Sequence, residues 1–281
     1  MLRFLLVLLA ALVTVGCVSN APQPATPTPK LALTPRDFRA QVKAGTGFLR
    51  AMYRPERGLL QESPSVGNHN YFLANDALLA VRAAELSGDK ELAENLRTTL
   101  QKYRVEGNDF IEVAWGKTIP WPPKHFEDPG SLVEQQGDDR ILTIRHEGPG
   151  YFYDWSAYSN LAFMAAVNEF NRGNREAARR LYELEMGTFD GQGFPDKAFH
   201  DRKGVYETLG LAWGAYAAAK LCLDPPATLL ETLRAQQDPV TGGFHTHYRL
   251  DAYRLADPDV ETTSVALLAF QTLQKRECPD K

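Results

Sequence analysis

The chain has 281 residues, of which 44% are hydrophobic and 23% are charged. These proportions are ordinary for a globular protein. The formal net charge of -4 leaves no basic excess for binding phosphates, so we predict no nucleic-acid partner. No segment after the N-terminal apolar run reaches membrane-spanning length, and that run is itself too short.

The N-terminal segment has the layout of a secretory signal. One positive charge at Arg3 precedes an apolar run over residues 4–13, which is too short to span a bilayer core of about 30 Å. Thr14-Val15-Gly16-Cys17 follows and resembles the lipobox of bacterial lipoproteins, although Thr14 departs from the usual leucine. The resemblance implies a signal peptide over 1–16 and a diacylated Cys17. The alternative is an ordinary cleaved signal.

A proline-rich stretch separates this cysteine from the rest of the chain. Residues 21–29 contain four prolines and no large apolar residue, so we expect 17–30 to be an extended tether. Residues 31–281 are then one domain, long enough for a single core. We expect an extracytoplasmic, membrane-anchored lipoprotein of the cell envelope whose lipid anchor inserts in the membrane. Val18 after the anchor cysteine favours the outer membrane where the source has one.

The remaining chain has helical periodicity throughout. Four segments are apolar on nearly every side and predict buried helices, over 70–86, 154–170, 205–221 and 258–274. Four others carry charge on one face and predict outer helices, over 35–53, 90–103, 175–186 and 227–237. We therefore expect an all-α chain of about four helical hairpins in an inner and an outer layer.

The connections between these helices repeat as well. Each places a Gly or Asp before a large apolar residue and then a polar one, as in Gly58-Leu59-Leu60-Gln61-Glu62, Gly193-Phe194-Pro195-Asp196 and Gly243-Phe244-His245-Thr246. With residues 236–244 and 261–269, this pattern resembles the α/α-toroid proteins, which include terpenoid cyclases, prenyltransferase subunits and several glycosidases. The resemblance implies a toroid or partial toroid with a central cavity. The alternative is an open stack of helical hairpins.

Acidic residues recur at the starts of the expected inner helices. Aligning these helices puts Asn75, Ala157, Glu207 and Glu261 in equivalent positions, with Asp76 and Asp154 close by. Because the starts of parallel helices converge, we predict a catalytic group of carboxylates, namely Asp76, Asp154, Glu207 and Glu261. The alternative is that each acid only stabilises the first turn of its helix.

Aromatic and amide side chains near the same helix starts are typical of a sugar site. We predict that the substrate contacts Asn75, Trp155, Tyr158, Tyr206, His245 and His247. The spacing of His245 and His247 also suits a metal in an extended segment, but an isolated pair of this kind is weak evidence. We therefore predict no metal and no cofactor.

Two cysteines remain after the anchor, Cys222 and Cys278. An even number in an oxidising compartment favours a disulfide, and two unpaired thiols are the alternative. The leading hypothesis is an envelope lipoprotein that binds a glycan or glycoconjugate. If it also cleaves this ligand, we expect a glycoside hydrolase or polysaccharide lyase. The rival is a noncatalytic scaffold or receptor for a protein, lipid or isoprenoid.

Overall fold

The computed structural model describes residues 37–64, 70–103, 110–125, 131–143, 149–199, 202, 204–249, 256–276 and 278. The expected signal peptide (1–16), the lipid-bearing Cys17 and the tether (17–30) lie outside the described residues. Within the described ranges, no helix is both long enough and apolar enough to cross a membrane.

Eight α-helices lie in the described residues. The inner layer is formed by helices buried on nearly every side, namely α2 (Ala74–Ser87), α4 (Ser159–Asn171), α6 (Thr208–Lys220) and α8 (Val260–Lys275). The outer layer is formed by α1 (Arg39–Met52), α3 (Lys90–Tyr103), α5 (Arg175–Met186) and α7 (Ala227–Ala235). Three short 3-10 helices are η1 (Phe110–Trp115), η2 (Trp155–Ala157) and η3 (Lys197–Phe199).

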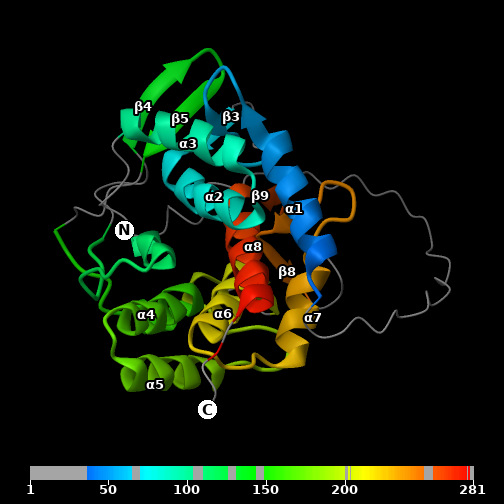
Figure 1. Cartoon of the computed structure of the whole chain (residues 1–281). Helices are drawn as coiled ribbons and strands as arrows, with labels where there is room; N and C mark the ends of the chain where they lie inside the picture. The colour runs from blue at the N-terminus through cyan, green and yellow to red at the C-terminus, as the bar shows by residue number, and fades with distance from the viewer. Residues whose placement is uncertain are drawn as a thin grey trace, which may run out of the picture.

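The inner helices pack in the order α2, α8, α6, α4, and η1 contacts both α4 and α2. Figure 1 shows α8 between α2 and α6. The outer helices α1, α3, α5 and α7 pack on α8, α2, α4 and α6 respectively. Small side chains permit the close contacts of α6, because a Cβ on Gly214 would lie 3.0 Å from the ring of Phe163 in α4. The hydrophobic core therefore runs through the inner layer.

The described residues are 55% helical and 15% strand, so the fold is mixed α/β and the prediction of an all-α chain is wrong. The strands are β1 (Tyr53–Arg54), β2 (Leu59–Leu60), β3 (Asn70–Leu73), β4 (Ser131–Gln136), β5 (Asp139–Thr143), β6 (Val205–Glu207), β7 (Phe244–His245), β8 (His247–Arg249) and β9 (Pro258–Asp259). They form four small sheets, with the orders β1-β2, β3-β5-β4, β6-β8 and β7-β9.

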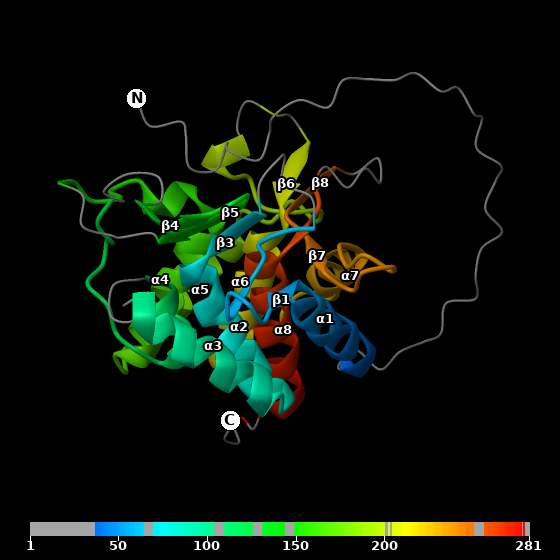
Figure 2. The same cartoon turned by 90° about the horizontal axis from the view of Figure 1, so that it is seen from above.

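The error has a local cause. The expected helices at 70–86, 205–221 and 258–274 begin where the structure has β3, β6 and β9, and α2, α6 and α8 start only afterwards. Strands of two to four residues are too short to reveal their alternation of side chains beside a long apolar helix. In Figure 2, β3, β5, β6 and β8 lie to one side, and α8 runs away from them toward the C-terminus.

A disulfide joins two helices of the inner layer at the end opposite the small strands. Cys222 follows α6, Cys278 follows α8, and the two form a disulfide whose Cα atoms are 5.7 Å apart. The bridge joins two neighbouring inner helices just beyond their C-terminal ends.

Candidate functional site

Each inner helix has a buried carboxyl group at its start. Asp76 is the third residue of α2, and Glu207 immediately precedes α6. Asp259 caps α8 by accepting a hydrogen bond of 2.7 Å from a backbone N–H of the first turn. Asp196 accepts hydrogen bonds from the N–H and the hydroxyl of Ser159, the first residue of α4, at 3.0 and 3.3 Å. These contacts satisfy amides that a helix start would otherwise leave unpaired.

A fifth carboxyl group, that of Glu62, comes from the connection between β2 and β3. Its backbone N–H donates to Tyr71 O of β3 at 2.8 Å, and its carbonyl accepts from Val260 N of α8 at 3.0 Å. Its side chain hydrogen-bonds to Asp76. The backbone of Glu62 thus ties the start of α8 to the strand that leads into α2.

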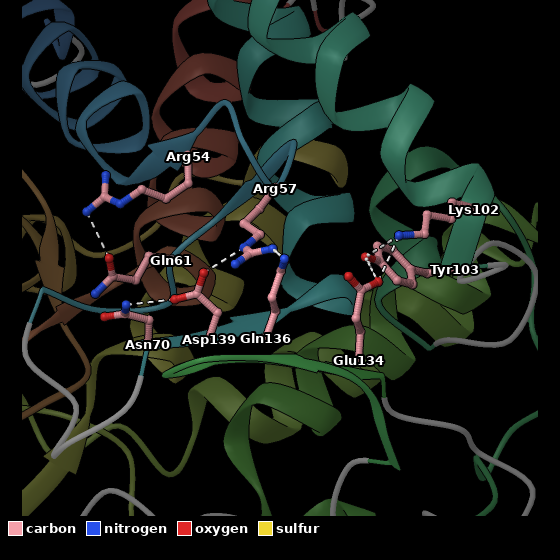
Figure 3. A network of polar contacts seen from close by, with 9 residues as sticks. All are labelled: Arg54, Arg57, Gln61, Asn70, Lys102, Tyr103, Glu134, Gln136 and Asp139. Carbon is pink, nitrogen blue, oxygen red and sulfur yellow. Dashed lines mark hydrogen bonds and ion pairs between the residues drawn. The ribbon is translucent and has the colours of Figure 1, made fainter.

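A polar network holds this connection in place (Figure 3). Arg54 donates to the side chain of Gln61 at 2.8 Å, and Gln61 in turn donates to the carbonyl of Ser63 at 3.0 Å. On the adjoining sheet, Arg57 and Asn70 both bind Asp139 of β5, at 2.6 and 2.8 Å. These contacts link β5 to β3 and to the turn between β1 and β2.

The same network fastens the β4–β5 hairpin to the outer layer. Lys102 and Tyr103 of α3 both bind the Glu134 carboxylate of β4, at 2.8 and 3.1 Å (Figure 3). The cation and the hydroxyl lower the pKa of Glu134. The β3–β5–β4 sheet is therefore held at both edges, and β3 leads into α2 from a fixed position.

Glu62 and its neighbours are close enough to change each other's proton affinity. Burial raises the pKa of Glu62 well above its ordinary value, and the charges of Asp76, Asp259 and Glu261 raise it further. Burial also raises the pKa of Asp259 to about 7. Burial disfavours the charged form of a carboxyl group, so Glu62 and Asp259 bind their protons more tightly than exposed carboxyl groups do.

Glu207 and Asp196 extend this group toward α4. The pKa of Glu207 is raised well above its ordinary value by burial and then by the charges of Asp196 and Asp259. Burial also raises the pKa of Asp196, although the amide and hydroxyl of Ser159 oppose it. We call this group the carboxyl cluster, and its members are Glu62, Asp76, Asp196, Glu207, Asp259 and Glu261.

Several buried polar atoms at the cluster make no hydrogen bond within the described residues. They include one carboxyl oxygen each of Glu62 and Glu207, and the hydroxyls of Ser63 and Thr208 next to them. Buried polar atoms are nearly always paired, and exceptions often mark a functional site. These unpaired oxygens mark the cluster as the candidate functional site.

The structure brings three of the four predicted catalytic acids into this cluster. Asp76, Glu207 and Glu261 belong to it, and Asn75 is buried beside Asp76 at the start of α2. Asp154 does not belong to it. Its side chain is 42% exposed and pairs with Lys197, which lowers the pKa of Asp154.

The predicted aromatic contacts fall into two environments. Tyr206 is buried, its ring stacks on Tyr248 at 5.7 Å, and its hydroxyl donates to Asp190 at 2.5 Å. Asp190 and burial raise the pKa of Tyr206 to about 12. Its ring therefore packs within the protein, whereas Trp155 and Tyr158 are only half-buried.

The two predicted histidine contacts lie in different sheets. His247 of β8 pairs with Glu207 of β6 in register, and burial lowers the pKa of His247 to about 4, helped by the charges of Arg202 and His245. His245 Nδ1 lies 2.5 Å from Ala256 O, and its Nε2 lies 3.4 Å from an Asp238 oxygen. Among the described residues, no group of three or more acids, histidines or cysteines has the geometry to hold a metal ion.

Sequence reasoning missed Glu62, Asp196 and Asp259. A signal for two of them was present, because Glu62 and Asp196 occupy the polar position of the repeated connections. Residues at this position lie at the starts of inner helices. Glu62 accepts a hydrogen bond from Val260 N of α8, and Asp196 accepts one from Ser159 N of α4. Asp259 was hidden because residues 258–274 were assigned to one helix, which placed its true N-cap inside the helix.

No family model, curated protein or solved structure matches this chain. The resemblance of its repeated connections to α/α-toroid proteins therefore stays a prediction, and function has to be argued from the site.

Proposed function

We propose that this chain is a cell-envelope lipoprotein whose carboxyl cluster binds a glycan and hydrolyses it by general acid–base catalysis. The supporting observation is that acids from separate inner-helix starts converge while differing in proton affinity. Glycoside hydrolysis needs such a pair, one carboxyl protonated and one ionised, separated by more than a hydrogen bond.

Glu207 and Asp259 suit the two roles best. Burial and neighbouring charge hold the proton on Glu207, whereas the pKa of Asp259 is about 7, so this group is partly ionised at neutral pH. The charge of Asp259 raises the pKa of Glu207, whereas Glu62 and Asp76 are directly hydrogen-bonded.

The proposed reaction consumes one water molecule. Glu207 donates its proton to the glycosidic oxygen as the bond from that oxygen to the anomeric carbon breaks. Asp259 accepts a proton from water as the water oxygen bonds to the anomeric carbon. The products are two shorter sugars, and a proton passing from Asp259 to Glu207 restores the starting state.

Release of new reducing ends from a broad panel of oligosaccharides tests this proposal. Glu207→Gln and Asp259→Asn are expected to lower turnover by at least about 100-fold, the usual contribution of one general acid or base. Glu185→Gln is the matched control, because Glu185 is also buried with a pKa of about 7 but lies on the outer helix α5. Binding without turnover in the wild type would favour a noncatalytic receptor. Equal loss of turnover in all three variants would overturn the roles assigned to Glu207 and Asp259.

The membrane anchor is a separate part of the proposal with its own test. Cys17→Ser removes the acylated thiol, so the chain is expected to move from the detergent phase to the aqueous phase on detergent partitioning. Retention of this variant in the detergent phase would show that another segment anchors the protein.

A further inference from the structure

Two tyrosines near the start of α4 are unusually exposed. The side chain of Tyr153 is 77% exposed and that of Tyr151 is 39% exposed, with ring centroids 5.8 Å apart. Aromatic rings so exposed contribute little to packing in the core. Their exposed faces are suited to binding a flat, partly apolar ligand.

The backbone beneath these rings is fixed by pairing with the segment before it. His125 N donates to Gly150 O, and Phe152 N donates to Pro123 O, both at 2.9 Å. Phe152 is buried, and its ring lies 4.1 Å from that of His125. A hydrogen bond of 2.9 Å from Tyr153 N to Tyr151 O closes a tight turn around the buried Phe152, and the tyrosines on either side of it are exposed. The backbone that carries the two rings is therefore held in place before any ligand arrives.

The ion pair of Asp154 with Lys197 links these rings to the carboxyl cluster, because each partner adjoins one of the two groups along the chain. Asp154 follows Tyr153 and pairs with Lys197, whose amine also lies 5.8 Å from the ring of Tyr158. Asp196 precedes Lys197, and its charge raises the pKa of Glu207. A long ligand lying across Asp154 and Lys197 would thus extend from the tyrosines toward the proposed general acid.

We propose that Tyr151 and Tyr153 form an outer subsite, the tyrosine platform, for a neutral oligosaccharide whose far end reaches the carboxyl cluster. This inference rests on the proposed function in naming a glycan as the ligand. Sugar rings present an apolar face of C–H groups that stacks on aromatic rings, while their hydroxyls bind polar side chains. A neutral chain fits best, because the cluster is acidic and the charge of Lys197 is engaged by Asp154.

The proposal predicts binding that depends on the length of the oligosaccharide. Calorimetry on the full chain would use two neutral β-1,4-linked series, of glucose and of N-acetylglucosamine, from one to six units. Affinity is expected to rise with length in at least one series. Tyr153→Ala should weaken binding of the longest member by roughly tenfold, or about 1.4 kcal/mol, and leave binding of the shortest unchanged. Tyr153→Phe should restore binding, because the ring and not the hydroxyl makes the contact.

Leu184→Ala is the matched control, since Leu184 is a 71% exposed apolar side chain on the outer helix α5. If Tyr153→Ala binds oligosaccharides of every length as tightly as the wild type does, the platform is overturned while the proposed hydrolysis is left intact. Length-dependent binding that Tyr153→Ala abolishes, in a wild type that cleaves nothing, supports the platform and overturns hydrolysis. Absence of binding by the wild type to every member of both series overturns the platform.

Discussion

Replacing Asp259 by Asn tests whether the carboxyl cluster opposes folding at neutral pH. Asp259 is 7% exposed, and burial raises its pKa from an ordinary value of 3.8 to about 7. Between these two values the folded chain binds more protons than the unfolded chain, so stability falls as pH rises. Three pKa units at 1.36 kcal/mol each give a loss on the order of 4 kcal/mol between about pH 4 and pH 7.

Asp259→Asn removes this titration while keeping the helix cap, because Asn caps helices about as well as Asp. The variant also removes a charge that raises the pKa of Glu62. Urea denaturation of both proteins at pH 4.5, 6 and 7.5 measures the effect. We expect the free energy of unfolding of the wild type to fall more steeply, by up to about 1.4 kcal/mol per pH unit, so that the variant is the more stable protein at pH 7.5.

Asp190→Asn is the control for this experiment. Although burial opposes it, hydrogen bonds from Tyr206 and from backbone amides hold the pKa of Asp190 below its ordinary value. Its contribution to stability is therefore lost only in more acidic solution, and its replacement should not flatten the curve above pH 4.5. Parallel pH profiles for the wild type and Asp259→Asn would refute the idea that burial keeps Asp259 protonated.

Two further predictions concern packing and covalent closure. Gly210→Ala should destabilise the fold by about 1–3 kcal/mol, because a Cβ at this position would lie 2.2 Å from the Ser159 hydroxyl. Gly47→Ala should instead stabilise helix α1 by roughly 0.5–1 kcal/mol, because the space around Gly47 is open. Equal changes in melting temperature for the two variants would contradict this difference. Reduction of the bond between Cys222 and Cys278, which are 56 residues apart, should cost about 4 kcal/mol in the chain-entropy model. Unchanged urea midpoints with and without reductant would show that the bridge does not constrain the unfolded chain.

The sequence predicted the outer helices better than the inner ones. The ranges 90–103 and 175–186 agree with α3 and α5 to the residue, because charge on one face gives a clear helical period and each helix begins after a turn. The inner helices lack that contrast, so their apolar pattern continues backwards into β3, β6 and β9. Strand pairing between distant segments, such as β6 with β8, leaves no such local pattern.

The site was predictable only where its residues lie on helix starts. Alignment of the inner helices found Asp76, Glu207 and Glu261, since position along a helix can be read from its period. Glu62 comes from a connection, and its position depends on backbone contacts with Tyr71 and Val260 that join distant parts of the chain. Such contacts follow from the assembled fold and not from neighbouring residues.

The disulfide has a consequence for motion within the inner layer. It ties α6 to α8 beyond their C-terminal ends, whereas strands of two or three residues hold the polypeptide at their N-terminal ends. Fluctuations that separate these two helices therefore cost the least free energy at the N-terminal end, because no covalent bond joins the helices there. Glu207 and Asp259 are the N-cap residues of these two helices, so an opening at that end would change the separation of their carboxyl groups while the rest of the core stayed packed.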